Sequence, residues 1–135
     1  MAFVAAFVQS IKYEVPPETY ESVEHGEVNT IGIFMPLETL YRGKGDCDTK
    51  SLLYASIVAN MRDPHIVFLV GKQGHEHLFV GIRGVPRKGD RFITLNGVKY
   101  VLLELTAPLG LGKIPENEWD AYKRGKLKPL KVVGD

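Results

Sequence analysis

The change in hydrophobic period around Pro64 constrains the fold of this chain more than any other feature of the sequence. Apolar residues recur at helical spacing from about residue 47 to residue 61, and Pro64 ends this helix because proline disfavours helical backbone in the preceding residue. From His65 to Gly71 the residues are instead β-branched and aromatic, which is typical of a strand buried on both faces. A long helix followed by consecutive strands predicts the α+β class.

Three more strands are expected after the first one. The dipeptide Asn96-Gly97 separates two strand-like runs and tolerates the positive φ angles of a two-residue type I′ turn, so it predicts a hairpin. The helix that begins at Cys47 should pack on the resulting sheet. We therefore predict one antiparallel sheet that contains residues 65–71, 77–83, 91–95 and 98–105.

The remaining segments carry weaker signals. Residues 2–12 have helical spacing, whereas the Pro- and Glu-rich stretch 15–29 is too polar to be buried and indicates a long loop. Short extended or helical pieces are expected within 31–40, and a short helix around 116–122. The chain has 135 residues and no internal repeat, so we expect a single domain over 1–135, excised from a longer protein.

Charge and hydropathy argue against some classes of partner. The chain holds 17 basic and 16 acidic residues, a net charge of +1, which gives no indication of nucleic-acid or anionic-membrane binding. No apolar run approaches the ~20 residues that cross a bilayer, and the first residues lack the basic region of a signal peptide. Compartment and oligomeric state stay open. A basic cluster near the C-terminus is expected to be a solvated tail: Lys123, Arg124, Lys126, Lys128 and Lys131.

Cys47, the only cysteine, carries most of the functional information. It follows Gly45 and Asp46 in a small, polar run that leads directly into the helix. At a helix start, unpaired backbone N–H groups and the helix dipole favour a thiolate. A lone cysteine is by default a buried apolar filler, but these surroundings favour a nucleophile.

A thiol nucleophile needs a base, and the base needs a group that orients it. The histidines available are His25, His65, His75 and His77, and the last two flank the start of the second expected strand. Glu104 places a carboxylate in an otherwise apolar strand, where an unpaired charge would be costly. His-x-His together with a thiolate is also compatible with zinc, although no second cysteine pair supports a metal site.

Three blocks of sequence stand out together: Gly45 to Ser51, His77 to Ile82, and Leu102 to Thr106. They resemble the bacterial transglutaminase-like superfamily, which shares the papain-like thiol fold. Its members show a Gly-Asp-Cys-acid-x-basic-Ser motif, a histidine before an apolar strand, and a strand that ends in Asp or Glu before Thr. The segments 7–13 and 36–40 are similar to its upstream helix and to the stretch before the nucleophile, so the resemblance spans about residues 7–119.

The resemblance implies a papain/transglutaminase-like core and a role for each matching residue. Cys47 would be the nucleophile, His77 the base and Glu104 the orienting acid; His77 is preferred to His75 because it directly precedes its apolar strand. Gln9 and the Cys47 backbone N–H would form the oxyanion hole, although a surface glutamine is an equally good interpretation of Gln9. No cofactor and no metal are implied.

Two classes of function follow. The first is a cysteine hydrolase that cleaves a peptide or protein amide, with transamidation where an amine outcompetes water. The second is a non-catalytic binding domain that keeps the fold within a larger protein.

Other polar and aromatic residues are expected to have structural roles. Asp46 is expected to cap the helix, and Lys50 to be solvated or to pair with Asp46 or Asp48. Trp119 and Tyr122 are expected to anchor a loop rather than line a substrate groove.

Overall fold

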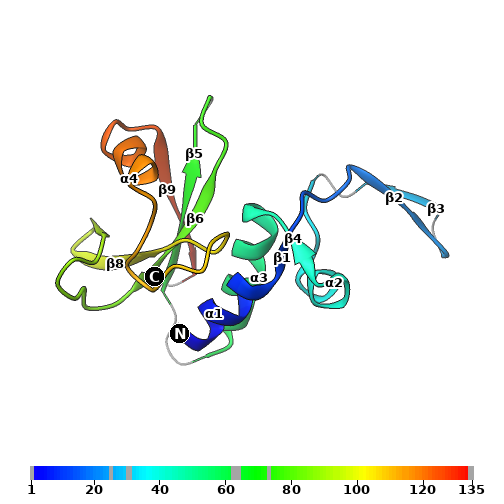
Figure 1. Cartoon of the computed structure of the whole chain (residues 1–135), viewed down its shortest axis with the longest axis horizontal. Coiled ribbons are helices and arrows are strands. Elements are labelled where there is room, and N and C mark those ends of the chain that lie inside the picture. Colours follow the sequence, from blue (N-terminus) through cyan, green and yellow to red (C-terminus); the bar gives the residue numbers. More distant parts are fainter. Residues whose placement is uncertain (1, 25, 30–31, 62–64, 73, 134–135) are drawn as a thin grey trace.

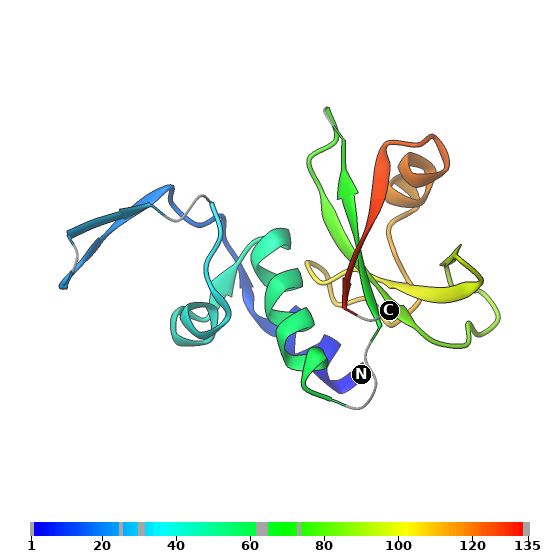
Figure 2. The same cartoon turned by 180° about the vertical axis from the view of Figure 1, so that it is seen from behind.

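A computed structural model describes residues 2–24, 26–29, 32–61, 65–72 and 74–133. This part of the chain has the α+β fold, with four helices and a curled, antiparallel five-stranded sheet of order β7-β8-β6-β5-β9 (Figures 1 and 2). In chain order the elements are α1 (Ala2–Ser10), β1 (Lys12–Tyr13), β2 (Thr19–Ser22), β3 (Gly26–Asn29), α2 (Pro36–Arg42), β4 (Lys44–Gly45), α3 (Cys47–Ala59), β5 (Ile66–Gly71), β6 (Leu78–Arg83), β7 (Phe92–Leu95), β8 (Val98–Leu103), α4 (Glu116–Lys123) and β9 (Leu127–Val133).

The antiparallel sheet predicted from the sequence is confirmed. β5 pairs with β6, β6 with β8, and β8 with β7, all in antiparallel register. Asn96 and Gly97 form the turn between β7 and β8 with φ angles of 49° and 80°, the left-handed geometry that a type I′ turn requires. The expected helices near residues 2–12, 47–61 and 116–122 also form, while the predicted helix stop at 62–64 lies outside the described residues.

The fifth strand, β9, was not predicted. The sequence indicated a solvated basic tail here, but Leu127 is buried and the strand pairs antiparallel with β5, from Leu127 opposite Gly71 onward. The prediction was wrong because β9 is an edge strand, where lysine side chains such as Lys128 remain exposed while the backbone pairs with the sheet.

The stretch 15–29 is not a continuous loop, as the sequence indicated. It contains the antiparallel hairpin β2–β3, which projects away from the body of the molecule (Figure 1). Such a hairpin buries little, so its strands tolerate the polar composition that argued for a loop. The first helix is also shorter than predicted, because it ends at Ser10 and the chain continues as β1, paired in parallel with β4.

Two apolar cores lie on opposite faces of the sheet. α1 and α3 cover one face, whereas α4 packs on the other (Figures 1 and 2). Neighbouring residues of β5 contribute alternately, Ile66 to the first core and Val67 to the second. This explains why the strand sequences are continuously apolar rather than alternating. Within the described residues, no helix is both long and apolar enough to span a membrane.

The start of α3 is fixed by Asp46 and Gly45. The Asp46 carboxylate accepts a hydrogen bond of 3.1 Å from the Thr49 backbone N–H, as predicted for a helix cap. Gly45 runs so close to the helix that a Cβ there would lie 2.6 Å from Thr49 Cγ2, which only glycine avoids. These local contacts place Cys47 at the first position of the helix.

Candidate active site

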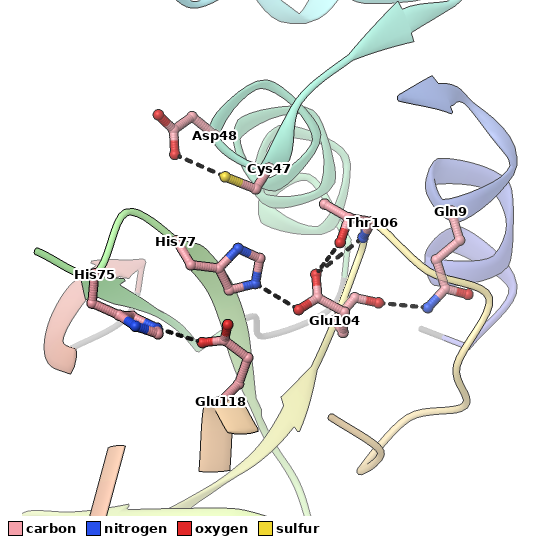
Figure 3. Close-up of polar contacts among 8 residues, drawn as sticks. All are labelled: Gln9, Cys47, Asp48, His75, His77, Glu104, Thr106 and Glu118. Atoms are coloured by element: carbon pink, nitrogen blue, oxygen red, sulfur yellow. Dashed lines mark hydrogen bonds and ion pairs between the residues drawn. The ribbon is translucent and has the colours of Figure 1, made fainter. Parts of the chain in front are cut away.

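Three separate elements bring Cys47, His77 and Glu104 together (Figure 3). Cys47 begins α3, His77 immediately precedes β6, and Glu104 immediately follows β8. Because β6 and β8 are antiparallel, with Val80 opposite Leu103, the start of one strand lies beside the end of the other. The register of the sheet therefore brings the histidine and the carboxylate to the same end of the strand pair β6–β8. The helix α3, which begins with Cys47, starts at this end.

The His77–Glu104 contact is short and largely shielded from water. His77 Nε2 lies 2.6 Å from Glu104 Oε2, with side-chain exposures of 18% and 2%. The other carboxylate oxygen, Oε1, accepts hydrogen bonds of 3.1 Å and 2.8 Å from the backbone N–H and hydroxyl of Thr106. Both oxygens of this buried carboxylate are thus satisfied, which fixes it against the imidazole.

The Cys47 sulfur lies between two polar partners. Its thiol donates to Asp48 Oδ1 over 3.5 Å, and the sulfur also interacts with the imidazole of His77, whose second ring nitrogen is on the side of Cys47 in Figure 3. Within the described residues, the backbone N–H groups of Cys47 and Asp48 make no hydrogen bond. They are therefore available to an oxyanion at the sulfur.

A cleft of about 410 Å³ opens on the sulfur and the imidazole. Its walls combine apolar and acidic side chains, and they include Tyr13 and Val15, neither of which was predicted as a site residue. Tyr13 lines the cleft together with Cys47 and His77, and burial and then the charges of Cys47, Asp46, Asp48 and Glu104 raise the pKa of its phenol. The lining residues are Tyr13, Val15, Asp46, Cys47, Asp48, Val70, Gly71, Glu76, His77 and Leu78.

The electrostatics of the site favour a protonated His77. Burial alone would lower its pKa, but hydrogen bonds with Cys47 and Glu104 and the charges of Glu104 and Glu118 outweigh burial and raise the pKa to about 10. For Glu104, burial opposes ionisation, yet His77 and Thr106 together lower its pKa. An imidazolium held beside the Glu104 carboxylate is the form that protonates a leaving group.

We expect the free energy of unfolding to decrease as the pH rises from about 6.5 to about 10. The folded-state pKa of His77 is raised from 6.5 to about 10, so its contribution is complete below about 6.5 and lost through about 10. The pKa of Glu104 is lowered, so its contribution is present above 4.5 and lost as the pH falls. Thermal melts from below pH 4.5 to about pH 10 measure both limbs. His77→Gln should flatten the alkaline limb, and an unchanged slope in that variant would contradict the assignment.

Gln9 was predicted to form the oxyanion hole with the Cys47 backbone N–H, but its side-chain amide is directed elsewhere. Its side-chain amide donates to the backbone carbonyls of Glu104, at 2.7 Å, and Leu109, at 2.6 Å, and Figure 3 shows it on the far side of Glu104 from His77. Both N–H bonds of the amide are used, which leaves none for an oxyanion. Gln9 instead ties α1 to the segment that follows β8 and so holds the backbone of Glu104.

The prediction that Lys50 is solvated or pairs with Asp46 or Asp48 is wrong. Lys50 is 1% exposed, and its Nζ donates to the backbone carbonyl of Ile11 over 2.5 Å. Burial lowers its pKa, and the nearby Glu104 carboxylate opposes that shift. Lys50 therefore connects α3 to the turn between α1 and β1.

The two competing histidines have separate partners. His75 Nε2 lies 2.7 Å from Glu118 Oε2 of α4, whereas His77 turns to Glu104. Among the described residues, no group of three or more His, Cys, Asp or Glu side chains is arranged to hold a metal ion. Trp119 and Tyr122 of α4 stack on each other and pack against the second core, and neither is among the residues that line the cleft.

Comparisons of this chain with protein-family models, with curated proteins and with solved structures find no match.

Proposed function

We propose that this chain is a thiol-dependent amide hydrolase of the transglutaminase-like type, with a papain-like core and Cys47, His77 and Glu104 as its catalytic residues. One observation carries the proposal. His77 has one ring nitrogen fixed at 2.6 Å by a buried carboxylate and shares a cleft with the only cysteine, which begins a helix. The three residues also follow the order helix start, strand start and strand end that the sequence motifs imply.

In the first half of the reaction, the Cys47 thiolate attacks the carbonyl carbon of an amide. The carbonyl electrons move to oxygen, and the resulting oxyanion accepts a hydrogen bond from the Cys47 backbone N–H. Tyr13 offers a hydroxyl donor on the cleft wall, in place of Gln9. The imidazolium of His77 protonates the leaving nitrogen, the C–N bond breaks, and an amine and a thioester on Cys47 result.

In the second half, water attacks the thioester carbon while neutral His77 takes its proton. Collapse of this intermediate releases a carboxylic acid and regenerates the thiolate beside the imidazolium. A primary amine in place of water would give transamidation by the same steps. The side chains of Val15, Val70 and Leu78 provide an apolar wall beside the polar centre, which suits a peptide or protein amide as substrate.

We expect iodoacetamide to label Cys47 rapidly and stoichiometrically at about pH 6. Alkylation requires the thiolate, and an ordinary thiol with a pKa near 8.5 is almost entirely protonated at that pH. The measurement is the rate of mass increase of the intact protein, compared with that of free cysteine. Labelling no faster than free cysteine would contradict the proposal and leave a binding domain that keeps the fold.

His77→Ala is the matched control, because it removes the counter-ion without touching the sulfur. This variant should label at the rate of an ordinary thiol.

Substrate identity then follows from incubation of the wild-type protein with a peptide library and mass spectrometry of the acyl group trapped on Cys47. An acylated Cys47 that releases acid reports hydrolysis, whereas release to an added amine reports transamidation.

A further inference from the structure

A second His–Glu pair lies next to the first, and the proposed mechanism does not use it. His75 Nε2 is 2.7 Å from Glu118 Oε2, with side-chain exposures of 22% and 11%. His75 belongs to the turn between β5 and β6, and Glu118 lies in the first turn of α4. Figure 3 shows this pair beside His77 but turned away from Cys47. It therefore joins the turn to a helix on the other side of the sheet.

The turn that carries His77 is tight, and its backbone couples His75 to His77. Gly71 N–H donates to the His77 carbonyl over 2.8 Å, and His77 N–H donates to the His75 carbonyl over 3.1 Å. The turn folds so closely over Gly71 that a Cβ at this position would lie 1.7 Å from the His75 carbonyl oxygen. A displacement of His75 is therefore transmitted to the backbone of His77.

α4 provides a firm anchor for this turn. Ala121 of α4 and Leu127 of β9 are buried in the second core. A further backbone bond of 2.8 Å, from Lys72 N–H to the Lys126 carbonyl, ties the beginning of the turn to the segment between α4 and β9. The His75–Glu118 contact fastens the other end of the turn to the same region.

We propose that His75 and Glu118 are positioning residues for His77: their contact holds the β5–β6 turn on α4 and so keeps the imidazole between Cys47 and Glu104. The inference rests on the proposed function, because it assigns these residues to the same site. Glu118 also acts through its charge, since it contributes to the raised pKa of His77. Neither residue is placed in contact with substrate.

Four variants separate the contact from the charge. His75→Ala removes the contact, while His75→Gln keeps a nitrogen donor near the position of Nε2. Glu118→Gln keeps an oxygen acceptor for His75 but removes the charge. Glu116→Gln is the control, because Glu116 lies on the same helix and forms an exposed pair with Arg91 at 2.9 Å. Each protein is checked for its melting temperature before use.

The readouts are the rate of iodoacetamide labelling at about pH 6 and the NMR titration of the His77 imidazole. We expect His75→Ala to label roughly tenfold more slowly, because small misplacements of catalytic groups are costly, and His75→Gln to stay within about threefold of wild type. Glu118→Gln should lower the pKa of His77, and Glu116→Gln should change neither readout. If His75→Ala fails to fold, Glu118→Ala takes its place, because it removes the same contact from the side of the helix.

Wild-type labelling rates and an unchanged His77 titration in both His75→Ala and Glu118→Gln would overturn the inference. Equal effects in Glu116→Gln would also overturn it, because they would reflect the helix as a whole. Failure of the proposed function is distinct, since it would appear as slow labelling of the wild-type protein. The His77 titration tests the influence of Glu118 in either case.

Discussion

Cys47→Ser is expected to reduce amide hydrolysis by roughly 10⁴-fold or more while the protein keeps its fold. Serine is nearly isosteric with cysteine and suits the first turn of a helix, and Cys47 is only partly buried, so little packing is lost. The hydroxyl, however, has a pKa far above that of an imidazole. His77 is therefore too weak a base to convert the serine into an alkoxide, whereas the cysteine can react as a thiolate. Turnover of a peptide identified by acyl trapping measures the loss.

A displaced thiol is the control for this experiment. Adding Ser56→Cys to Cys47→Ser places a sulfur nine residues further along α3, about 13.5 Å along the helix axis at 1.5 Å per residue. Ser56 Oγ donates to the Leu52 carbonyl over 2.8 Å, within the helix itself. The double variant should label with iodoacetamide at the rate of an ordinary thiol and remain inactive. Substantial activity in Cys47→Ser would identify another nucleophile.

The elements that the sequence predicts correctly are those with local signals. Asp46 caps α3 through a residue three positions away, and Asn96 and Gly97 form the β7–β8 turn by their own backbone preferences. The same kind of signal gives the approximate positions of Cys47, His77 and Glu104 at element boundaries. Where the decisive interaction is within a few residues, the sequence is sufficient.

Three of the wrong predictions, for β9, Lys50 and Gln9, concern partners that lie far away in the chain. β9 pairs with β5, although β6, β7, β8 and α4 lie between these two strands in the chain. The basic side chains of β9 hide that pairing in the sequence. Lys50 is buried because a carbonyl of Ile11 receives its ammonium group. Gln9 donates to the Glu104 and Leu109 carbonyls, at sequence separations of 95 and 100 residues. The residue type predicts what kind of hydrogen bond each of these side chains can make, but not which distant group it contacts.

At the site itself, the carboxylate partners of His75 and His77 come from distant parts of the chain. The two residues are two positions apart in the tight turn between β5 and β6, so both imidazoles project from one turn. Glu104 and Glu118 select between them, and Glu118 comes from a helix whose place on the sheet depends on the second core. The sequence motif alone favours His77, because it directly precedes its apolar strand, and the structure adds a separate carboxylate partner for each of the two histidines.

Glu104→Gln is expected to slow amide hydrolysis by roughly 10²- to 10³-fold and to lower the pKa of His77. The neutral amide still fills the buried site, and its oxygen still accepts from Thr106, but it no longer stabilises the imidazolium. An amide N–H facing His77 Nε2 also favours the proton on the other ring nitrogen, which prevents neutral His77 from accepting a proton there. Activity is compared per folded molecule, with thermal melts of each variant.

Thr106→Val is the matched control for Glu104→Gln. It removes the hydroxyl donor at 2.8 Å from Glu104 Oε1 but keeps both the carboxylate charge and the backbone N–H bond. We expect this change to cost less than about tenfold in turnover, because the His77 contact persists. Full activity of Glu104→Gln at unchanged stability would leave a Cys-His dyad. A large loss of stability without a catalytic loss per folded molecule would make Glu104 structural, since a buried carboxylate with three hydrogen bonds stabilises the end of β8 whatever His77 does.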